Sequence, residues 1–267
     1  MTTPFSTNEM MIAAVARELK DGELGFVGIG TSGRAFTLAV GIPIVAARLA
    51  QFTHAPTFTV YWGNHLSPNL SQKPNALNQD AITNWMAAAC PASTADKVDM
   101  LTRRRFDLCF DSAPQIDRYG NMNITAIGDY RKPKVRLVGC LAQPDHLAFV
   151  KRPIIITDMS PRTFVEKVDF ITSAGYLSGG SSREEAGLGN GGPYRVITDK
   201  AVFDFEPGTR KMRLAGVYPG ITVEEVLRLM SFTPVVPQGV EQVPPPTDEQ
   251  IRLIRNVIDP GGAFLMA

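Results

Sequence analysis

The sequence contains few cysteines, few histidines and no long apolar run, and each shortage excludes a class of protein. The three cysteines are an odd number and lie far apart, mostly among apolar residues: Cys90, Cys109 and Cys140. We therefore expect reduced core thiols in a cytoplasmic protein rather than a disulfide framework. No C-x-x-C motif occurs, and the three histidines lack the spacing of metal ligands, so no metal site is predicted.

The sequence also lacks an excess of charge of either sign. The formal net charge is +1, and the one basic block is 103–105, so no nucleic-acid partner is expected. No segment offers 18 apolar residues, which argues against a membrane span. The N-terminus has no cationic leader region, and Arg17 and Glu18 interrupt its apolar stretch. This pattern is typical of a capped helix rather than a signal peptide.

Apolar runs typical of buried strands alternate with helical patterns along the chain. Strands are expected at 57–62, 108–110, 134–139, 154–157, 170–172, 202–205 and 211–215. Helices are expected from Ser6 or Thr7 to Leu19, at 42–52, 80–90 and 96–104, after Thr222, and at 247–258. The alternation predicts an α/β fold with an open, mostly parallel sheet flanked by helices.

Three segments without regular periodicity interrupt this pattern. The chain is long enough for one large domain or two small ones, but strand-like residues flank the Gly/Ser-rich stretch 175–193. We therefore expect a surface loop there, within a single domain over 1–267. Segment 65–79 is uncharged apart from Lys73, and a loop this long is usually functional or disordered. Around 25–33 a glycine-rich strand end resembles a phosphate-cradling turn, with Gly28, Gly30 and Thr31 as candidate ligand-binding residues. A dinucleotide fingerprint is not expected there, because no acidic residue follows some twenty positions later.

The polar crest 115–121 follows the predicted strand 108–110 and precedes a return to alternation. In open α/β sheets ligands bind beyond the carboxyl ends of strands, so the crest is a candidate binding loop. Its candidate residues are Gln115, Asp117, Arg118 and Asn121. The alternative is a self-satisfied Asx-turn with a surface arginine.

Three motifs carry a family resemblance. They are QIDRYGNMNIT from Gln115, VYPGITVEEV from Val217 and TDEQIRLIRNVIDP from Thr247. With them the chain resembles the β-type subunit of the family I CoA-transferases, nearest the glutaconate CoA-transferase B branch, over roughly Glu9 to Pro260. The resemblance implies an acyl-CoA substrate with no cofactor beyond its coenzyme A, and an α-type partner subunit in a heterodimer or heterotetramer. It implies no contact with membrane or nucleic acid.

The family's nucleophile is a glutamate at the end of the strand after the second helix. A carboxylate suits this role because, when desolvated, it both attacks a thioester and leaves well. That strand is 57–62 here, and either Tyr61 or Trp62 occupies the glutamate position. No Asp or Glu occurs from Ala55 to Gln79. Tyr61 could replace the carboxylate only with a depressed pKa, and no cationic neighbour is visible.

Three interpretations follow from the absent carboxylate. The heteromer performs hydrolysis, ring opening of a cyclic β-dicarbonyl acyl-CoA, or decarboxylation. Alternatively, it transfers CoA with a carboxylate from the partner subunit, or the chain is a non-catalytic scaffold. Asn64 and His65 complete the predicted site region, because His65 is a candidate general base and Asn64 can donate to an oxyanion. A solvated loop histidine is the alternative for His65.

Overall fold

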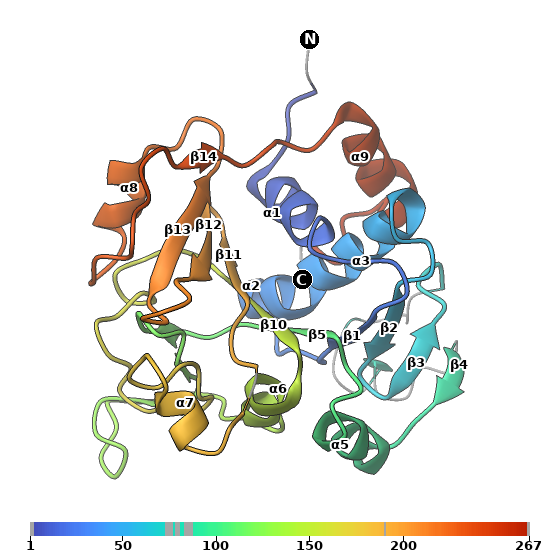
Figure 1. Ribbon diagram of the computed structural model, residues 1–267. Coiled ribbons are helices and arrows are strands. Elements are labelled where there is room, and N and C mark those ends of the chain that lie inside the picture. Colours follow the sequence, from blue (N-terminus) through green and yellow to red (C-terminus); the bar gives the residue numbers. More distant parts are fainter. Residues whose placement is uncertain (1–2, 73–76, 78–80, 83–87, 190, 266–267) are drawn as a thin grey trace. The chain divides into compact units, whose positions relative to one another are not determined.

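A computed structural model describes residues 3–72, 77, 81–82, 88–189 and 191–265. The chain forms two compact units: unit 1 comprises 1–112 and 245–267, and unit 2 comprises 113–244. Each has strands with flanking helices (Figure 1). The single domain expected over 1–267 stays a prediction.

Unit 1 is built around parallel strands with antiparallel neighbours at one edge. Its strands lie in the order β5 (Leu108–Asp111), β1 (Leu24–Val27), β2 (Thr59–Trp62), β3 (His65–Pro68) and β4 (Ala88–Pro91). β1 is parallel to β2 and β5, whereas β3 is antiparallel to β2 and β4. The crossover from β1 to β2 runs through α2 (Gly33–Phe36), the π-helix η1 (Thr37–Gly41) and α3 (Ile42–Thr53), as a parallel pair requires.

The helices of unit 1 begin where local capping chemistry predicts. The Ser6 hydroxyl accepts from the Glu9 N–H while the Glu9 carboxylate accepts from the Ser6 N–H, which confirms the capping box at the start of α1 (Thr7–Ala16). α1 packs against α3 (Figure 1). Glu9 also pairs with Arg255 of the π-helix η2 (Ile254–Ile258), 2.6 Å away. This pair ties the first helix to the segment formed by η2 and α9 (Asp248–Leu253). The helix α5 (Thr94–Thr102) also starts at a capping box, formed by Ser93 and Asp96.

The helical run 33–53 is long and apolar enough to cross a membrane by length and composition. In its most apolar window, however, 72% of the residues are buried inside the protein. Burial of this kind is typical of the core helix of a globular protein. We therefore assign this run to the core of unit 1.

Unit 2 combines parallel strand pairs with an antiparallel hairpin. β10 (Arg152–Thr157) is parallel to β11 (Arg195–Thr198), which is antiparallel to β12 (Ala201–Phe205). β12 and β13 (Met212–Val217) form the hairpin expected from the two apolar runs on either side of 206–209, and β14 (Glu241–Gln242) pairs parallel with β13. Two short ladders complete the set: β6 (Gln115–Ile116) with β7 (Met122–Asn123), and β8 (Ala126–Ile127) with β9 (Val135–Arg136).

An apolar cluster forms a core within unit 2. Phe164, Phe203 and Leu214 are buried in it, and the rings of Phe164 and Phe203 are 5.8 Å apart. The helices of unit 2 are α6 (Gln143–Phe149), α7 (Ser182–Glu185) and α8 (Val223–Arg228). Thr222 caps α8 as predicted, again with a capping box. Parallel strands with flanking helices, joined to antiparallel edge strands, confirm the predicted α/β class.

Some predicted elements differ from the structure, and the strand expected at 134–139 is shortened to β9 at 135–136. The helix expected at 80–90 is wrong at its end, because 88–91 forms β4; Asp80 and residues 83–87 lie outside the described residues. Residues 170–172 form no strand, and their backbone instead bonds to the β7 region through Met122. The Gly/Ser-rich stretch 175–193 is a loop as predicted, but it contains α7 and a buried arginine, so it is packed rather than free.

Candidate functional site

The carboxyl ends of β1 and β2 meet in unit 1. Val27 lies opposite Trp62, and the Gly63 N–H donates to the Val27 carbonyl at 3.1 Å. Gly63 has a φ of 61°, and a Cβ there would lie 3.2 Å from both Ile29 and Ile82. Glycine is therefore required for this turn. As a result, the glycine-rich turn after β1 and the turn after β2 lie at one edge of the strands.

The glycine-rich turn contains the predicted binding residues Gly28, Gly30 and Thr31. Thr31 is exposed, and both glycines are partly exposed. Gly30 adopts a φ of 64°, and a Cβ there would lie 2.8 Å from Val40. Packing thus explains the glycine at position 30. At Gly28 a Cβ would meet open space, so the main chain there is accessible to a ligand, which is the property that a phosphate-binding turn needs.

Tyr61 belongs to the core. Its side chain is 0% exposed, and its ring lies 5.8 Å from that of Phe26 and 5.5 Å from that of Phe106. Among the residues that the structure describes, its hydroxyl contacts the Ser93 carbonyl, at 3.5 Å. Burial, followed by the nearby charges of Asp96 and Cys90, raises the pKa of Tyr61 to about 12. The depressed pKa that a phenolate nucleophile needs is therefore absent.

Trp62 is equally buried. Its side chain is 0% exposed, and its ring lies 5.9 Å from that of Phe264. β2 ends at Trp62, and the next two residues form a turn. The alternation of faces along a strand therefore does not extend to Asn64, which is partly exposed in the turn. Trp62 and Asn64 therefore do not lie on a shared strand face.

His65 is the first residue of β3 rather than a loop residue. It lies opposite Trp62 in the β2–β3 hairpin and is 2% exposed, so the alternative of a solvated loop histidine is wrong. Burial lowers the pKa of His65, against a smaller opposing effect of a backbone hydrogen bond at Trp62. A neutral imidazole is competent as a base near pH 7, but this one is enclosed by protein.

A carboxylate that the sequence interpretation passed over lies at the end of the neighbouring strand. Asp111 is the last residue of β5, directly after the residue that pairs with Val27. It is 5% exposed, and its Oδ2 accepts from the Cys109 thiol at 3.5 Å. Burial, then the charge of Asp111, raises the pKa of the Cys109 thiol. Asp111 could have been found from the sequence, because it is an acidic residue directly after an apolar strand. Ligands of open α/β sheets bind beyond such strand ends.

The crest candidates Asp117 and Asn121 form a buried network in unit 2. The Asn121 amide donates to both Asp117 carboxylate oxygens, at 3.1 and 2.9 Å, and Asp117 also accepts from the Tyr119 N–H. The side-chain oxygen of Asn121, Oδ1, accepts from the backbone N–H groups of Gly175 and Leu177. Burial raises the pKa of Asp117 against these hydrogen bonds. The Asx-turn alternative thus describes the geometry, with the addition that it holds the loop at 175–177.

The other two crest residues also bond within unit 2. The Gln115 amide donates to Asp169 at 2.9 Å and accepts from the Asn123 side chain at 2.7 Å. Arg118 forms an ion pair with Glu166. Gln115 and Arg118 thus have partners in the protein, and a binding role for the four crest residues stays a prediction. They lie in unit 2, whereas the candidates at the ends of β1 and β2 lie in unit 1.

Comparison with known proteins identifies the family to which the chain belongs. Residues 8–229 match the family model described as Coenzyme A transferase. The chain belongs to the coenzyme A transferase family. This family member is 34% identical to the β-type subunit of 3-oxoadipate CoA-transferase from Pseudomonas knackmussii, over 94% of this chain and 92% of the relative. It is 31% identical to the cholesterol ring-cleaving hydrolase IpdB subunit of Mycobacterium tuberculosis, over 81% of this chain and 83% of the relative.

Solved structures agree with the sequence relatives. The glutaconate coenzyme A-transferase of Acidaminococcus fermentans superposes with a TM-score of 0.86 at 29% identity, covering 100% of both chains. The decarboxylase AibA/AibB shares the fold, with a TM-score of 0.80 at 21% identity over 99% of both chains. The predicted assignment to the β-type subunits, near the glutaconate CoA-transferase B branch, is confirmed, and this CoA-transferase-family chain is an enzyme subunit.

Proposed function

We propose that this chain is the β-type subunit of a heteromeric enzyme that acts on an acyl-CoA thioester by chemistry other than CoA transfer. The candidates are hydrolysis, ring opening of a cyclic β-dicarbonyl acyl-CoA, and decarboxylation. One observation carries the proposal: the end of β2 holds the buried, high-pKa Tyr61 and the buried Trp62 and no carboxylate.

A transfer mechanism of this family proceeds through a covalent carboxylate. The glutamate attacks the thioester carbonyl, and the resulting anhydride is then opened to an enzyme–CoA thioester. Neither an indole nor a protonated phenol forms an anhydride. Loss of the nucleophile from a covalent mechanism typically costs on the order of a million-fold in rate. Transfer through β2 is therefore disfavoured.

Relatives support both non-transfer chemistry and a partner subunit. IpdB is part of a ring-cleaving hydrolase, and the AibA/AibB fold is that of a decarboxylase made of two chains. By analogy, we place this chain in a complex with an α-type subunit, as a heterodimer or heterotetramer in the cytoplasm. Coenzyme A enters as part of the substrate, and the proposal includes no other cofactor.

A second function, CoA transfer with a carboxylate from another position, is favoured by the name of the 34% identical relative. The carboxylate would come from the α-type subunit or from Asp111 at the end of β5. In either case the enzyme would form a covalent CoA thioester on a side chain outside β2.

Trapping of covalent CoA distinguishes these functions. The heteromer is incubated with acyl-CoA and analysed by intact-mass spectrometry, with borohydride reduction to mark a thioester. We expect no CoA adduct on either subunit, but turnover of acyl-CoA under reducing, metal-free conditions. A CoA adduct in the wild-type heteromer would overturn the proposal in favour of transfer, and its loss in Asp111→Asn would locate the nucleophile. Binding without turnover of any acyl-CoA would indicate a scaffold.

A further inference from the structure

A hairpin in unit 2 carries apolar side chains into solvent. We call residues 128–141 the arm; it comprises the turn after β8, then β9 and the segment that follows β9 (light green in Figure 1). Val138 is 73% exposed and Leu141 is 76% exposed, the highest values among the large apolar side chains that the structure describes. Tyr130 and Val135, on the same arm, are exposed as well. Exposed apolar groups that gather on one segment, rather than occurring singly, mark an interaction surface.

Hydrogen bonds hold the arm in one conformation. The Leu137 N–H donates to the Thr125 carbonyl at 3.0 Å, which extends the ladder between β8 and β9. At the turn, the Asp129 carboxylate accepts from the N–H groups of Arg131 and Lys132, at 2.8 and 3.0 Å. An ordered surface of this kind loses less conformational entropy on binding than a disordered segment does.

Packing of one aromatic ring fixes the turn further. The Tyr130 ring stacks on that of Phe170, with centroids 5.0 Å apart and planes at 22°. The Arg136 guanidinium lies 5.2 Å from the centre of the Tyr130 ring and donates to the Tyr130 carbonyl at 3.2 Å. Ile171, which follows Phe170 in the chain, is exposed beside this stack. Tyrosine and arginine are both enriched in protein–protein interfaces.

The arm is also strongly basic. It contains four cations, Arg131, Lys132, Lys134 and Arg136, against the one carboxylate of Asp129. All four cations are exposed. Arg131, Lys132 and Lys134 form no ion pair with a residue in the described part of the chain. The arm thus presents positive charge around its apolar groups.

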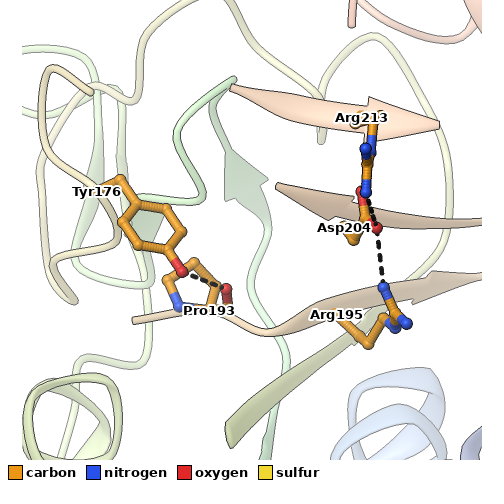
Figure 2. Close-up of polar contacts among 5 residues, drawn as sticks. All are labelled: Tyr176, Pro193, Arg195, Asp204 and Arg213. Atoms are coloured by element: carbon orange, nitrogen blue, oxygen red, sulfur yellow. Dashed lines mark hydrogen bonds and ion pairs between the residues drawn. The ribbon is translucent and has the colours of Figure 1, made fainter. Parts of the chain in front are cut away.

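Arginines on the strands of unit 2 are arranged differently. The Asp204 carboxylate of β12 accepts from Arg213 at 2.7 Å and from Arg195 at 3.0 Å (Figure 2). A carboxylate of the same unit therefore pairs with those guanidinium groups. Because Lys132 and Lys134 have no such carboxylate among the described residues, their charge favours an acidic group on another molecule.

The charge of the arm decides between two kinds of partner. A twofold contact uses the same patch on both subunits, so a second copy of this chain would place two arms together. The cations of the two arms would then repel one another. A non-identical subunit can instead present carboxylates around an apolar depression. The α-type subunit is non-identical, and the inference rests on the proposed heteromer.

We propose that the arm docks on the α-type partner subunit. Val138 and Leu141 would fill an apolar depression on that subunit, and Arg131, Lys132 and Lys134 would pair with carboxylates at its rim. Burial of apolar side chains at the centre of an interface mainly slows dissociation. Charges at the rim mainly raise the association rate and make it dependent on salt. The two groups of residues therefore have separable kinetic effects.

Surface plasmon resonance tests the proposal with the full chain and the α-type subunit of the same organism, at a series of sodium chloride concentrations. We expect Leu141→Ser to weaken the complex about tenfold, mainly through faster dissociation. Lys132→Glu should slow association about tenfold at low salt and reduce its salt dependence. The controls are Val236→Ser and Arg162→Glu, which change exposed residues of unit 2 outside the arm and should leave binding unchanged. Thermal unfolding of the isolated chain shows that each variant is folded.

Cys140 provides a readout without any substitution. Its thiol lies on the arm next to Leu141 and is exposed. Iodoacetamide should therefore alkylate Cys140 in the isolated chain, and this modification should be lost in the heteromer. Cys90, an exposed thiol of unit 1, is the internal reference for reagent activity. Peptide mass spectrometry measures both sites in the same sample.

The outcomes separate failure of the docking surface from failure of the heteromer. Wild-type affinity in both arm variants, or equal alkylation of Cys140 in the isolated chain and the heteromer, would overturn the proposal and leave the heteromer intact. A dimer of the isolated chain that Leu141→Ser dissociates would assign the arm to a second copy and also overturn it. No complex between the wild-type subunits would overturn the heteromer, and this inference with it. Because no turnover is measured, the result is independent of the reaction assigned to the enzyme.

Discussion

Replacement of Tyr61 by phenylalanine tests whether the end of β2 performs chemistry. The substitution removes one hydroxyl and keeps the ring that packs on Phe26 and Phe106. Within the described part of the chain, that hydroxyl makes a 3.5 Å contact with the Ser93 carbonyl, at the limit of a hydrogen bond. A good hydrogen bond contributes about 1 kcal/mol to stability, so this one contributes less. By contrast, Tyr61→Ala would remove a fully buried ring and cost about 3–5 kcal/mol.

We therefore expect Tyr61→Phe to lower the free energy of unfolding by less than about 1 kcal/mol. Turnover and acyl-CoA binding should stay within about threefold of wild type, which corresponds to less than about 1 kcal/mol. Urea denaturation measures the first quantity. Turnover is followed by mass spectrometry of the acyl-CoA consumed, which detects all three candidate reactions, and binding calorimetry on the heteromer measures affinity. The reasoning would be refuted by a folded variant that binds acyl-CoA normally but has lost turnover by a hundredfold or more. The phenol would then be a chemical group in spite of a pKa of about 12.

Three further predictions concern the turns and the strand network. Gly63→Ala should destabilise the chain by about 1–2 kcal/mol, because alanine is strained at a φ of 61°. Thermal unfolding measures this loss of stability. Gly22→Ala is the control, because Gly22 also has a positive φ but no neighbour within 4 Å of an added Cβ, so the difference between the two variants gives the cost of crowding. Asn121→Ala should cost about 2–4 kcal/mol and expose the loop at 175–177 to protease, since Asp117 would stay buried without its amide donor; unchanged proteolysis would contradict this. Although burial opposes it, bonding to Arg213 lowers the pKa of Asp204, so its stabilising contribution is present above the ordinary aspartate pKa and is lost as pH falls through the lower folded value. Asp204→Asn should flatten the stability profile in that acidic range, and an unchanged profile would exclude this role.

Features that depend on residues near in sequence could be predicted. Ser6 and Thr222 cap helices that were expected to begin beside them, because each hydroxyl accepts from the N–H three positions later. The Asx-turn at Asp117 is likewise local, because its carboxylate accepts from the N–H two residues later. Alternating apolar runs gave β2 and the β12–β13 hairpin to within two residues.

Features that depend on distant partners could not be predicted. His65 is in a strand because it pairs with Trp62 on one side and with Pro91 on the other, and nothing in segment 65–79 alternates to indicate this. Arg183 is buried because carbonyls as far away as Leu147 accept its protons. Such contacts override local propensity, which would place an arginine among glycines and serines on the surface.

The two aromatic residues at the end of β2 also explain the stability of a strand end that holds no carboxylate. An ionised carboxylate enclosed to the same degree would need compensating charge or hydrogen bonds, because an unpaired buried ion is costly. Tyr61 and Trp62 instead bury large apolar surfaces, each worth about 1.5–3 kcal/mol or more. A buried aromatic pair stabilises the strands and contributes no nucleophile. The end of β2 is thus built for packing, which agrees with the proposed function, in which the reacting groups lie outside β2.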